Sequence, residues 1–233
     1  MKKNINFLDL GLQPLANNYL NKSQLKRKEK KYRLKVGLNI ETKLVSINKP
    51  LSSKIMFNNK YPYRSAMSKT MLKSFKDLSK LINKKFKPNK ILEIGSNDGS
   101  FIKNFSKKKV IGIEPCSNVE KITKKNGFNT YAKYWNNKTA NKILEKDGKV
   151  DLIYSANTIS HIQNLNEVFQ SINVILSENG ILIIEDPSLL ECLKKNTYDQ
   201  FYNEHIYVFS TIGIENILKK HDFEIFHIQN LSI

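Results

Sequence analysis

The feature that most constrains this chain is a glycine-punctuated turn that follows a short apolar strand, expected over Ile91–Ile94. Gly95 lets the backbone turn sharply at the end of that strand. Gly99 opens the next expected helix, whose first backbone N–H groups have no partner within the helix and can face a ligand. A second expected strand, 110–113, ends in the acidic residue Glu114. In doubly wound α/β sheets, ligands bind beyond the carboxyl ends of the strands, and an acid at this spacing binds ribose hydroxyls.

The spacing of the glycines distinguishes two classes of cofactor. A dinucleotide fingerprint has the pattern G-x-G-x-x-G, whereas residues 93–99 read Glu-Ile-Gly-Ser-Asn-Asp-Gly. This spacing is a poor cradle for a pyrophosphate. It resembles the first motif of methyltransferases that depend on S-adenosyl-L-methionine (SAM), in which the acid lies at the end of the strand and the ligand carries no phosphate. SAM is therefore the expected cofactor.

Apolar strands and amphipathic helices alternate along the chain after Pro88. Such alternation is typical of a parallel sheet with helices on both faces. The expected fold class is α/β, with the doubly wound sheet of a Rossmann-like class I methyltransferase and a small N-terminal appendage. A strand pair within 36–47 and a helix from about Ser65 are expected before the first strand of this sheet. Further strands are expected at 90–94, 110–113, 128–131, 150–155, 180–184 and 223–228, and helices near 99–106, 117–126, 136–146, 164–176 and 210–220.

The net charge of +18 is concentrated in the first part of the chain. Residues 1–90 hold 23 Lys and Arg against 4 Asp and Glu. This surface could bind RNA or another phosphate-bearing partner, or its lysines could simply be solvated. Only three arginines are present, with little aromatic interleaving. That composition argues against a nucleic-acid partner.

The lengths of the apolar runs and the number of cysteines indicate the expected cellular compartment of the protein. No run near Met1 has the length of a signal peptide, and none approaches the ~18 apolar residues of a membrane span. Two cysteines, Cys116 and Cys192, cannot form a disulfide framework or a four-cysteine zinc site. A cytoplasmic protein without a membrane partner is expected.

Six motifs, in order, resemble the deoxysugar C-methyltransferase family, which methylates carbon 3 of a nucleotide-linked 4-keto sugar. The matching segments are 10–17 (Leu-Gly-Leu-Gln-Pro-Leu-Ala-Asn), 57–68, 93–99, 112–118, 157–162 and 199–205. The resemblance implies SAM as cofactor and a nucleotide-diphosphate keto sugar as substrate. It also implies that an enolate forms next to the keto group before the methyl group is transferred.

The resemblance and the chemistry together assign roles to residues. His205 is the candidate base, since its ordinary pKa of ~6.5 can be tuned by a neighbouring carboxylate. Glu204 is expected to orient His205 or to hold a sugar hydroxyl. Tyr202, together with Tyr63 or Tyr61, is expected to donate hydrogen bonds to the developing enolate oxygen. The implied cofactor-binding residues are Glu93, Gly95, Asn97, Asp98, Gly99, Glu114 and Asn157. The implied substrate-binding residues are Tyr61, Asn118 and His161.

Three of these residues have a plainer interpretation. His205 could be a surface loop histidine, and His161 could cap a helix. Glu114 could be a strand-end acid that caps the following helix.

The chain departs from the family pattern in three places. The family has a zinc-binding module with paired C-x-x-C motifs, but Asn39 and Thr42 occupy the cysteine positions here. Since an amide and a hydroxyl cannot replace thiolates as zinc ligands, no metal is expected. Asn203 occupies a position where the family usually has histidine. The family also continues with a glycine-rich strand and a C-terminal domain that helps to hold the nucleotide sugar, whereas this chain stops at Ile233. Residues 1–64 are thus expected to be a degenerate module, and residues 65–233 a methyltransferase domain truncated at its C-terminal end.

Two alternative functions remain open. The first is an RNA methyltransferase that uses the basic residues of the N-terminal part. The second is a truncated, inactive remnant that binds SAM without turnover.

Overall fold

The computed structural model describes residues 4–231, which form two compact units. Among the described residues, the first unit comprises 4–56, 159–165 and 186–224, and the second unit comprises 57–158, 166–185 and 225–231. Both units are built from discontinuous segments. The sequence-based division into residues 1–64 and 65–233 has other boundaries than these units, and it stays a prediction.

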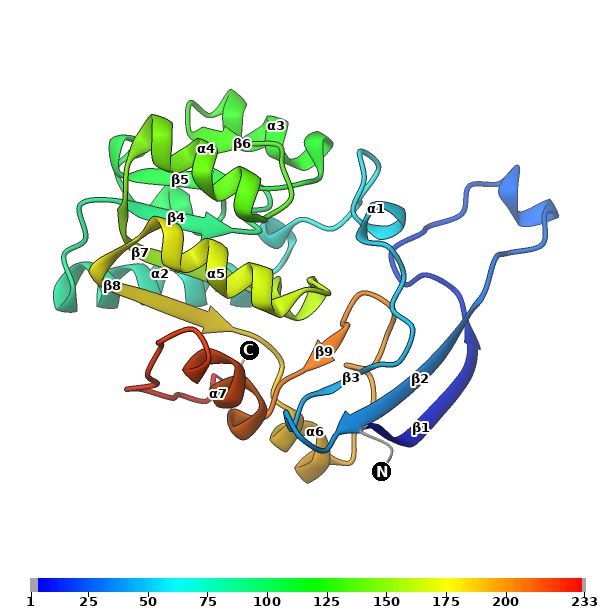
Figure 1. The fold of residues 1–233 in the computed structure, drawn as a ribbon. Coiled ribbons are helices and arrows are strands. Elements are labelled where there is room, and N and C mark those ends of the chain that lie inside the picture. Colours follow the sequence, from blue (N-terminus) through cyan, green and yellow to red (C-terminus); the bar gives the residue numbers. More distant parts are fainter. Residues whose placement is uncertain (1–3, 232–233) are drawn as a thin grey trace. The chain divides into compact units, whose positions relative to one another are not determined.

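The second unit contains a parallel sheet of five strands in the order β6-β5-β4-β7-β8 (Figure 1). The strands are β4 (Ile91–Ile94), β5 (Val110–Ile113), β6 (Asn129–Tyr131), β7 (Val150–Ala156) and β8 (Leu176–Glu185). The middle strand β4 pairs in parallel with β5 on one side and with β7 on the other. The predicted doubly wound sheet is therefore confirmed. The turn after β4 lies where the strand order reverses, which is the usual ligand position in such sheets.

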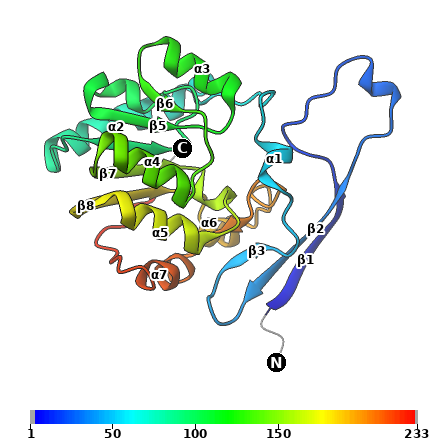
Figure 2. The ribbon, with the colours of Figure 1, turned by 45° about the horizontal axis from the view of Figure 1, so that its top comes forward.

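Helices surround this sheet (Figures 1 and 2). They are α2 (Lys69–Lys85), α3 (Ser117–Lys125), α4 (Asn137–Asp147) and α5 (Leu165–Ile175), with short 3₁₀ segments η2 (Ser65–Met67), η3 (Ile102–Asn104) and η4 (Lys107–Lys109). Helix α2 begins later than predicted because the hydroxyl of Ser68 accepts the N–H of Met71 at 3.2 Å and caps it. The helix predicted near 99–106 is wrong, since only η3 forms there.

One face of the parallel sheet is filled by aromatic packing. Leu152 and Tyr154 are two residues apart in β7, so their side chains lie on the same face of the sheet. Phe75 of α2 lies 6.2 Å from the Tyr154 ring, and Phe101 lies 4.0 Å from it, between ring centroids. Both phenylalanines are buried. This core anchors α2 and the segment after the β4 turn to the sheet.

The first unit contains an antiparallel sheet in the order β1-β2-β3-β9. Its strands are β1 (Asn4–Gln13), β2 (Tyr32–Asn39), β3 (Val45–Ile47) and β9 (Tyr207–Val208), and Figure 2 shows β1, β2 and β3 side by side. The predicted strand pair within 36–47 is confirmed as β2 and β3. Helical segments complete the unit. These segments are η1 (Gln24–Lys26), α1 (Ser53–Met56), η5 (Ile159–His161), α6 (Leu189–Lys195) and α7 (Thr211–Lys219).

The strand predicted at 223–228 is wrong. These residues have no regular secondary structure. The side chains of Phe226 and Ile228 are 69% and 60% exposed, so the apolar alternation that predicted a strand finds no core to face.

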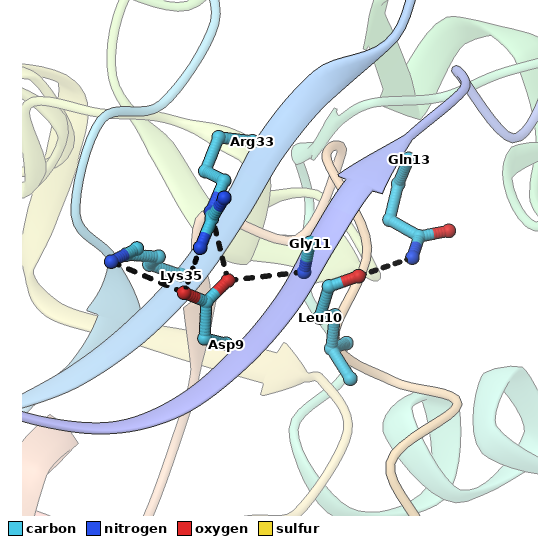
Figure 3. A network of polar contacts seen from close by, with 6 residues as sticks. All are labelled: Asp9, Leu10, Gly11, Gln13, Arg33 and Lys35. Atoms are coloured by element: carbon cyan, nitrogen blue, oxygen red, sulfur yellow. Dashed lines mark hydrogen bonds and ion pairs between the residues drawn. The ribbon is translucent and has the colours of Figure 1, made fainter.

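A bulge in β1 is held by the carboxylate of Asp9 (Figure 3). Its Oδ1 accepts the N–H of Gly11 and the Nε–H of Arg33, both at 3.0 Å, and its Oδ2 lies 3.1 Å from the Lys35 ammonium. The Arg33 guanidinium holds the pKa of Asp9 well below its usual range. Gly11 has a positive φ of 71°, which the bulge requires. The pairing of β1 with β2 therefore continues past the irregularity.

Candidate active site

The turn after β4 is closed against the neighbouring strand. The N–H groups of Gly95 and Ser96 donate to the Ile113 carbonyl at 2.8 and 2.9 Å. Gly95 has a φ of +78°, and a β-carbon there would lie 2.0 Å from the Oγ1 of Thr158. Only glycine fits this position. Gly99 closes the turn, since its N–H donates to the Ser96 carbonyl at 2.9 Å.

Asn97 and Asp98 connect this turn to the chain before α2. The Oδ1 of Asn97 accepts the N–H of Ser65 at 2.9 Å, and its Nδ2 donates to the Tyr63 carbonyl at 3.3 Å. The Oδ2 of Asp98 accepts the N–H of Ala66 at 3.0 Å. Both side chains thus hold the 63–66 segment over the turn. Their direct contact with a cofactor stays a proposal.

Two buried carboxyl groups lie at the ends of β4 and β5. The Glu114 carboxylate accepts the N–H of Asn97 at 3.0 Å and the N–H of Cys116 at 2.7 Å. Each carboxylate oxygen has a second lone pair, so Glu114 can still accept from a ligand hydroxyl. The Oε2 of Glu93 has no hydrogen-bond partner among the described residues. Burial raises the pKa of Glu114 and, with the nearby charges of Asp98 and Glu114, raises that of Glu93 further.

The second unit also contains Tyr61 and Asn118, expected to bind the substrate, Tyr63, expected to be catalytic, and Asn157, expected to bind the cofactor. The Nδ2 of Asn118 donates to the backbone carbonyl of Tyr61 at 2.9 Å, while the buried Oδ1 of Asn118 has no partner among the described residues. Tyr61 is buried, with its ring edge-on to Phe57. Tyr63 is half exposed, and burial raises the pKa of its hydroxyl. Asn157 follows β7 in a left-handed conformation, and its N–H donates to the Glu185 carbonyl at 2.7 Å.

The first unit contains a separate cluster of three rings: Tyr202, His205 and His161. The His205 centroid lies 4.3 Å from that of Tyr202 and 4.9 Å from that of His161. Its Nδ1 lies 2.9 Å from the Gln200 carbonyl oxygen, and its Nε2 lies 3.0 Å from the Tyr202 hydroxyl. Because a carbonyl only accepts, Nδ1 carries the proton and the Nε2 lone pair accepts from Tyr202. The geometry thus defines the tautomer of His205.

Both histidines of this cluster are kept neutral. Burial lowers the pKa of His205 to about 4. Burial and the neighbouring His205 lower the pKa of His161 to about 3. At neutral pH the Nε2 atom of His205 is therefore a lone-pair acceptor, which is the form a general base needs. The interpretation of His205 as a surface loop residue is wrong, because its side chain is buried.

Glu204 and Asn203 lie in the tight turn that precedes His205. The N–H of His205 donates to the Tyr202 carbonyl at 3.0 Å and closes the turn. The Glu204 carboxylate accepts a hydrogen bond from the side-chain amide of Asn17 at 2.8 Å. Asn203 is buried, and its Nδ2 has no partner among the described residues. The structure therefore assembles the 202–205 run within the first unit, while the expected role of Glu204 stays a prediction.

Sequence reasoning missed Thr158 and Glu185. Thr158 closes over Gly95, as described above. The Oε2 of Glu185, at the end of β8, accepts the hydroxyl of Tyr154 at 2.8 Å, and burial raises the pKa of Glu185. An acid at the carboxyl end of a strand is the same signal that identifies Glu114. Glu185 directly follows the expected strand 180–184, just as Glu114 follows the strand at 110–113, so the same signal could have identified it.

The described residues were also compared with the requirements of a metal site and of a membrane-spanning helix. Residues 4–231 contain no group of three or more His, Cys, Asp or Glu side chains placed to hold a metal ion. Among the helices within that range, none has both the length and the apolar composition needed to cross a bilayer.

Comparison with known families decides the class of the protein. Residues 63–228, which contain the parallel sheet and the His205 turn, match the family described as "Methyltransferase domain". The chain belongs to this methyltransferase family. Residues 2–57 of the methyltransferase match a second family, described as "Putative zinc binding domain".

A curated relative has similar sequence throughout the chain. The methyltransferase is 21% identical over 234 residues to the C-methyltransferase NovU of Streptomyces niveus. The match covers 98% of this chain and 56% of NovU, so the chain spans little more than half the length of that relative.

Solved structures support the fold of the methyltransferase. A SAM-dependent methyltransferase of Thermotoga maritima superposes with a TM-score of 0.51 at 20% identity, covering 67% of this chain and 72% of that one. A protein of Nostoc punctiforme assigned as an O-methyltransferase gives a TM-score of 0.56 at 19% identity, covering 72% and 55%. The fold is the class I methyltransferase fold.

The cofactor of the methyltransferase is SAM, and the residues around the β4 turn fit it. SAM is a sulfonium cation without phosphate, and three acidic residues, Glu93, Asp98 and Glu114, lie near the turn. When these carboxyl groups are ionised, the site favours such a cation. The Oε2 of Glu93 is an acceptor without a partner in the described chain, and the bare backbone at Gly95 permits close approach. The assignment of these residues to the cofactor stays a proposal.

Proposed function

We propose that this methyltransferase transfers a methyl group from SAM to carbon 3 of a nucleotide-linked 4-keto-deoxysugar through an enolate. The relative NovU is named a C-methyltransferase. Methylation of carbon requires a base, because a C–H bond has no lone pair to attack the methyl group. Methylation of an amine or an ionised hydroxyl does not need a carbanion. The proposal therefore depends on a residue that can remove a proton from carbon.

The observation that carries the proposal is the hydrogen bonding of the His205 ring. The Gln200 carbonyl holds the proton on Nδ1, so Nε2 presents its lone pair. The ring is buried and neutral, and it stands next to a phenol hydroxyl. A neutral imidazole with a defined tautomer beside a hydroxyl donor can act as base and stabilise an oxyanion in the same step.

The proton and electron balance assigns the steps. The Nε2 of His205 takes the proton from carbon 3. The C–H electron pair then forms the double bond between carbons 3 and 4, and the π pair of the keto group moves onto its oxygen to give the enolate. Tyr202, once it no longer donates to Nε2, donates to that oxygen. SAM supplies the electrophilic methyl group. The enolate carbon forms the new C–C bond as the methyl–sulfur bond breaks and its electrons remain on sulfur.

The other predicted residues have supporting roles in the proposal. Tyr63 donates a hydrogen bond to the substrate. Asn118 offers its Oδ1 atom as an acceptor for a sugar or nucleotide hydroxyl, and its amide also holds the Tyr61 segment. Glu114 accepts the ribose hydroxyls of the cofactor, and Glu93 faces its charged groups.

Proton exchange at carbon 3 tests the proposal without relying on methyl transfer. The chain is incubated in D₂O with a dTDP-4-keto-6-deoxysugar and S-adenosylhomocysteine, and deuterium incorporation is followed by NMR. We expect exchange by the parent and its loss in His205→Asn. The matched control His227→Asn, at an exposed histidine, should exchange like the parent.

Methyl transfer then tests the complete reaction. With methyl-labelled SAM, label should appear at carbon 3 for the parent and for His227→Asn. Tight SAM binding by calorimetry with neither exchange nor transfer would contradict the proposal and favour the inactive remnant. Methyl transfer to RNA instead of the sugar would favour the RNA methyltransferase.

A further inference from the structure

The N-terminal segment makes a hydrogen bond to the signature run near the other end of the chain. The Nδ2 of Asn17 donates to the Oε1 of Glu204 at 2.8 Å. Both residues belong to the first unit. Glu204 is 2% exposed, so its carboxylate is removed from water and depends on protein donors for its orientation. We propose that Asn17 is a positioning residue that fixes the Glu204 carboxylate for the reaction. This inference rests on the proposed function.

The segment that carries Asn17 is anchored by the sheet of the first unit. Asn17 follows the end of β1, where Gln13 is paired with Tyr32 of β2. After β1 the chain makes a turn, in which the N–H of Asn18 donates to the Leu15 carbonyl at 3.3 Å. The amide of Asn17 is therefore presented from a turn that follows the end of β1 by four residues.

Glu204 lies close in sequence to residues that pair with β3 of the same sheet. The N–H of Ile47, in β3, donates to the Ile206 carbonyl at 2.8 Å. Residues Tyr207–Val208 form β9 immediately afterwards and pair with β3. Phe201, just before the run, packs with Val45 and Val208 in one buried cluster. The donor and the acceptor of the Asn17–Glu204 bond thus lie in segments that adjoin strands of one sheet.

The chemistry of the pair suits a carboxylate that must stay charged. An amide donor satisfies a carboxylate oxygen without adding a positive charge, whereas a lysine would pair with it and reduce its negative potential. Glu204 adjoins His205, the proposed base, in the sequence. A carboxylate fixed in the adjoining residue can hold a sugar hydroxyl next to that base. The module that matches a zinc-binding family would thereby contribute to catalysis through one hydrogen bond.

The first test compares Asn17→Ala with Asn18→Ala, its exposed neighbour. We expect Asn17→Ala to lower kcat at least about tenfold, as for loss of a hydrogen bond to a charged group, with the SAM affinity unchanged by calorimetry. Asn18→Ala should retain the activity of the parent. Equal activity of the two variants would overturn the proposal.

The conservative variant Asn17→Asp gives a pH signature that a merely structural role would not produce. When it is protonated, the introduced carboxyl group has the shape of the asparagine side chain and donates to Glu204, whereas the ionised group repels it. The kcat of Asn17→Asp should therefore approach that of the parent at low pH and fall as the pH rises. A pH profile parallel to that of the parent would overturn the proposal.

A stability cycle separates this inference from the proposed function. Melting temperatures are measured for the parent, Asn17→Ala, Glu204→Gln and the double variant. If the pair is coupled, the shift of the double variant is smaller than the sum of the two single shifts. An inactive parent with a coupled pair would contradict the proposed function alone. Additive shifts would contradict the Asn17–Glu204 contact whatever the parent's activity.

Discussion

The side chain of Thr158 lies so close to Gly95 that a β-carbon on residue 95 would be 2.0 Å from its Oγ1 atom. The segment after β7 therefore packs directly on the turn after β4, and it does so only because residue 95 is glycine. This contact connects the ends of two adjacent strands at the position where ligands bind in doubly wound sheets.

Replacement of Gly95 tests this contact. Gly95→Ala combines a steric clash with backbone strain at φ +78°, so we expect SAM affinity to fall more than about tenfold and the protein to be destabilised. Gly11→Ala is the matched control, because Gly11 has a φ of +71° but no atom within 4 Å of an added β-carbon. It should cost only the strain, about 1–2 kcal/mol. Similar SAM affinity in both variants, measured by calorimetry, would contradict the contact.

The buried carboxyl groups at the β4 turn predict how SAM binding depends on pH. Burial raises the pKa of Glu93 and that of Glu114 above the ordinary value of 4.5. As the pH rises through these raised pKa values, the carboxyl groups ionise and the cationic ligand binds more tightly. One linked proton changes the Kd by at most about tenfold per pH unit.

Calorimetry over a range of pH checks this prediction with two variants. Glu93→Gln should flatten the pH dependence of the SAM Kd, because residue 93 then has no proton to lose. Glu224→Gln, at an exposed position, should retain the dependence of the parent. A parent Kd that does not fall with rising pH would argue against an ionised Glu93 in the complex.

The buried histidines predict loss of stability in mild acid. The pKa of His205 is about 4 in the folded protein against about 6.5 when unfolded, so the unfolded state binds more protons between these values. The stabilisation is fully present above pH 6.5 and is lost as the pH falls toward 4. It amounts to about 3 kcal/mol for His205. Urea unfolding at several pH values should show a smaller loss for His205→Asn, and the parent's loss for His227→Asn.

The β2–β3 turn predicts that the N-terminal module is stable without metal. The Oδ1 of Asn39 accepts the N–H groups of Glu41 and Thr42 at 3.0 and 2.9 Å, and the Thr42 hydroxyl accepts the N–H of Leu44 at 3.4 Å. These side chains hold the turn at the two positions that the family resemblance assigns to zinc-binding cysteines. Asn39→Ala should destabilise the protein by about 1 kcal/mol. A chelator should leave the melting temperature unchanged, and a chelator-dependent decrease would contradict this account.

Local patterns predicted the parallel sheet well. Strands β4, β5 and β7 are short, largely apolar and largely buried runs, the pattern expected of strands buried on both faces. The acid at the end of β5 and the glycine at the end of β4 follow from the same reasoning. The helix predicted near 99–106 did not form, because the N–H groups of Asn104 and Phe105 donate to carbonyls three residues earlier and give only the 3₁₀ segment η3.

Partners that are distant in sequence were beyond prediction. Strand β9 has only two residues, and its pairing with β3 is what defines it. The tautomer of His205 depends on the Gln200 carbonyl, a backbone atom that carries no sequence signal. The donor to Glu204 is likewise invisible locally, although Asn17 lies in the first of the six family-like motifs.

The pairing of β9 with β3 also has a consequence for biosynthesis. Strands β1, β2 and β3 leave the ribosome long before Tyr207 and Val208 are translated, and until then β3 has an unpaired edge. Unpaired edges of nascent sheets are sites of intermolecular association. A nascent chain arrested before β9 should therefore recruit chaperones, and one arrested beyond α7 should release them.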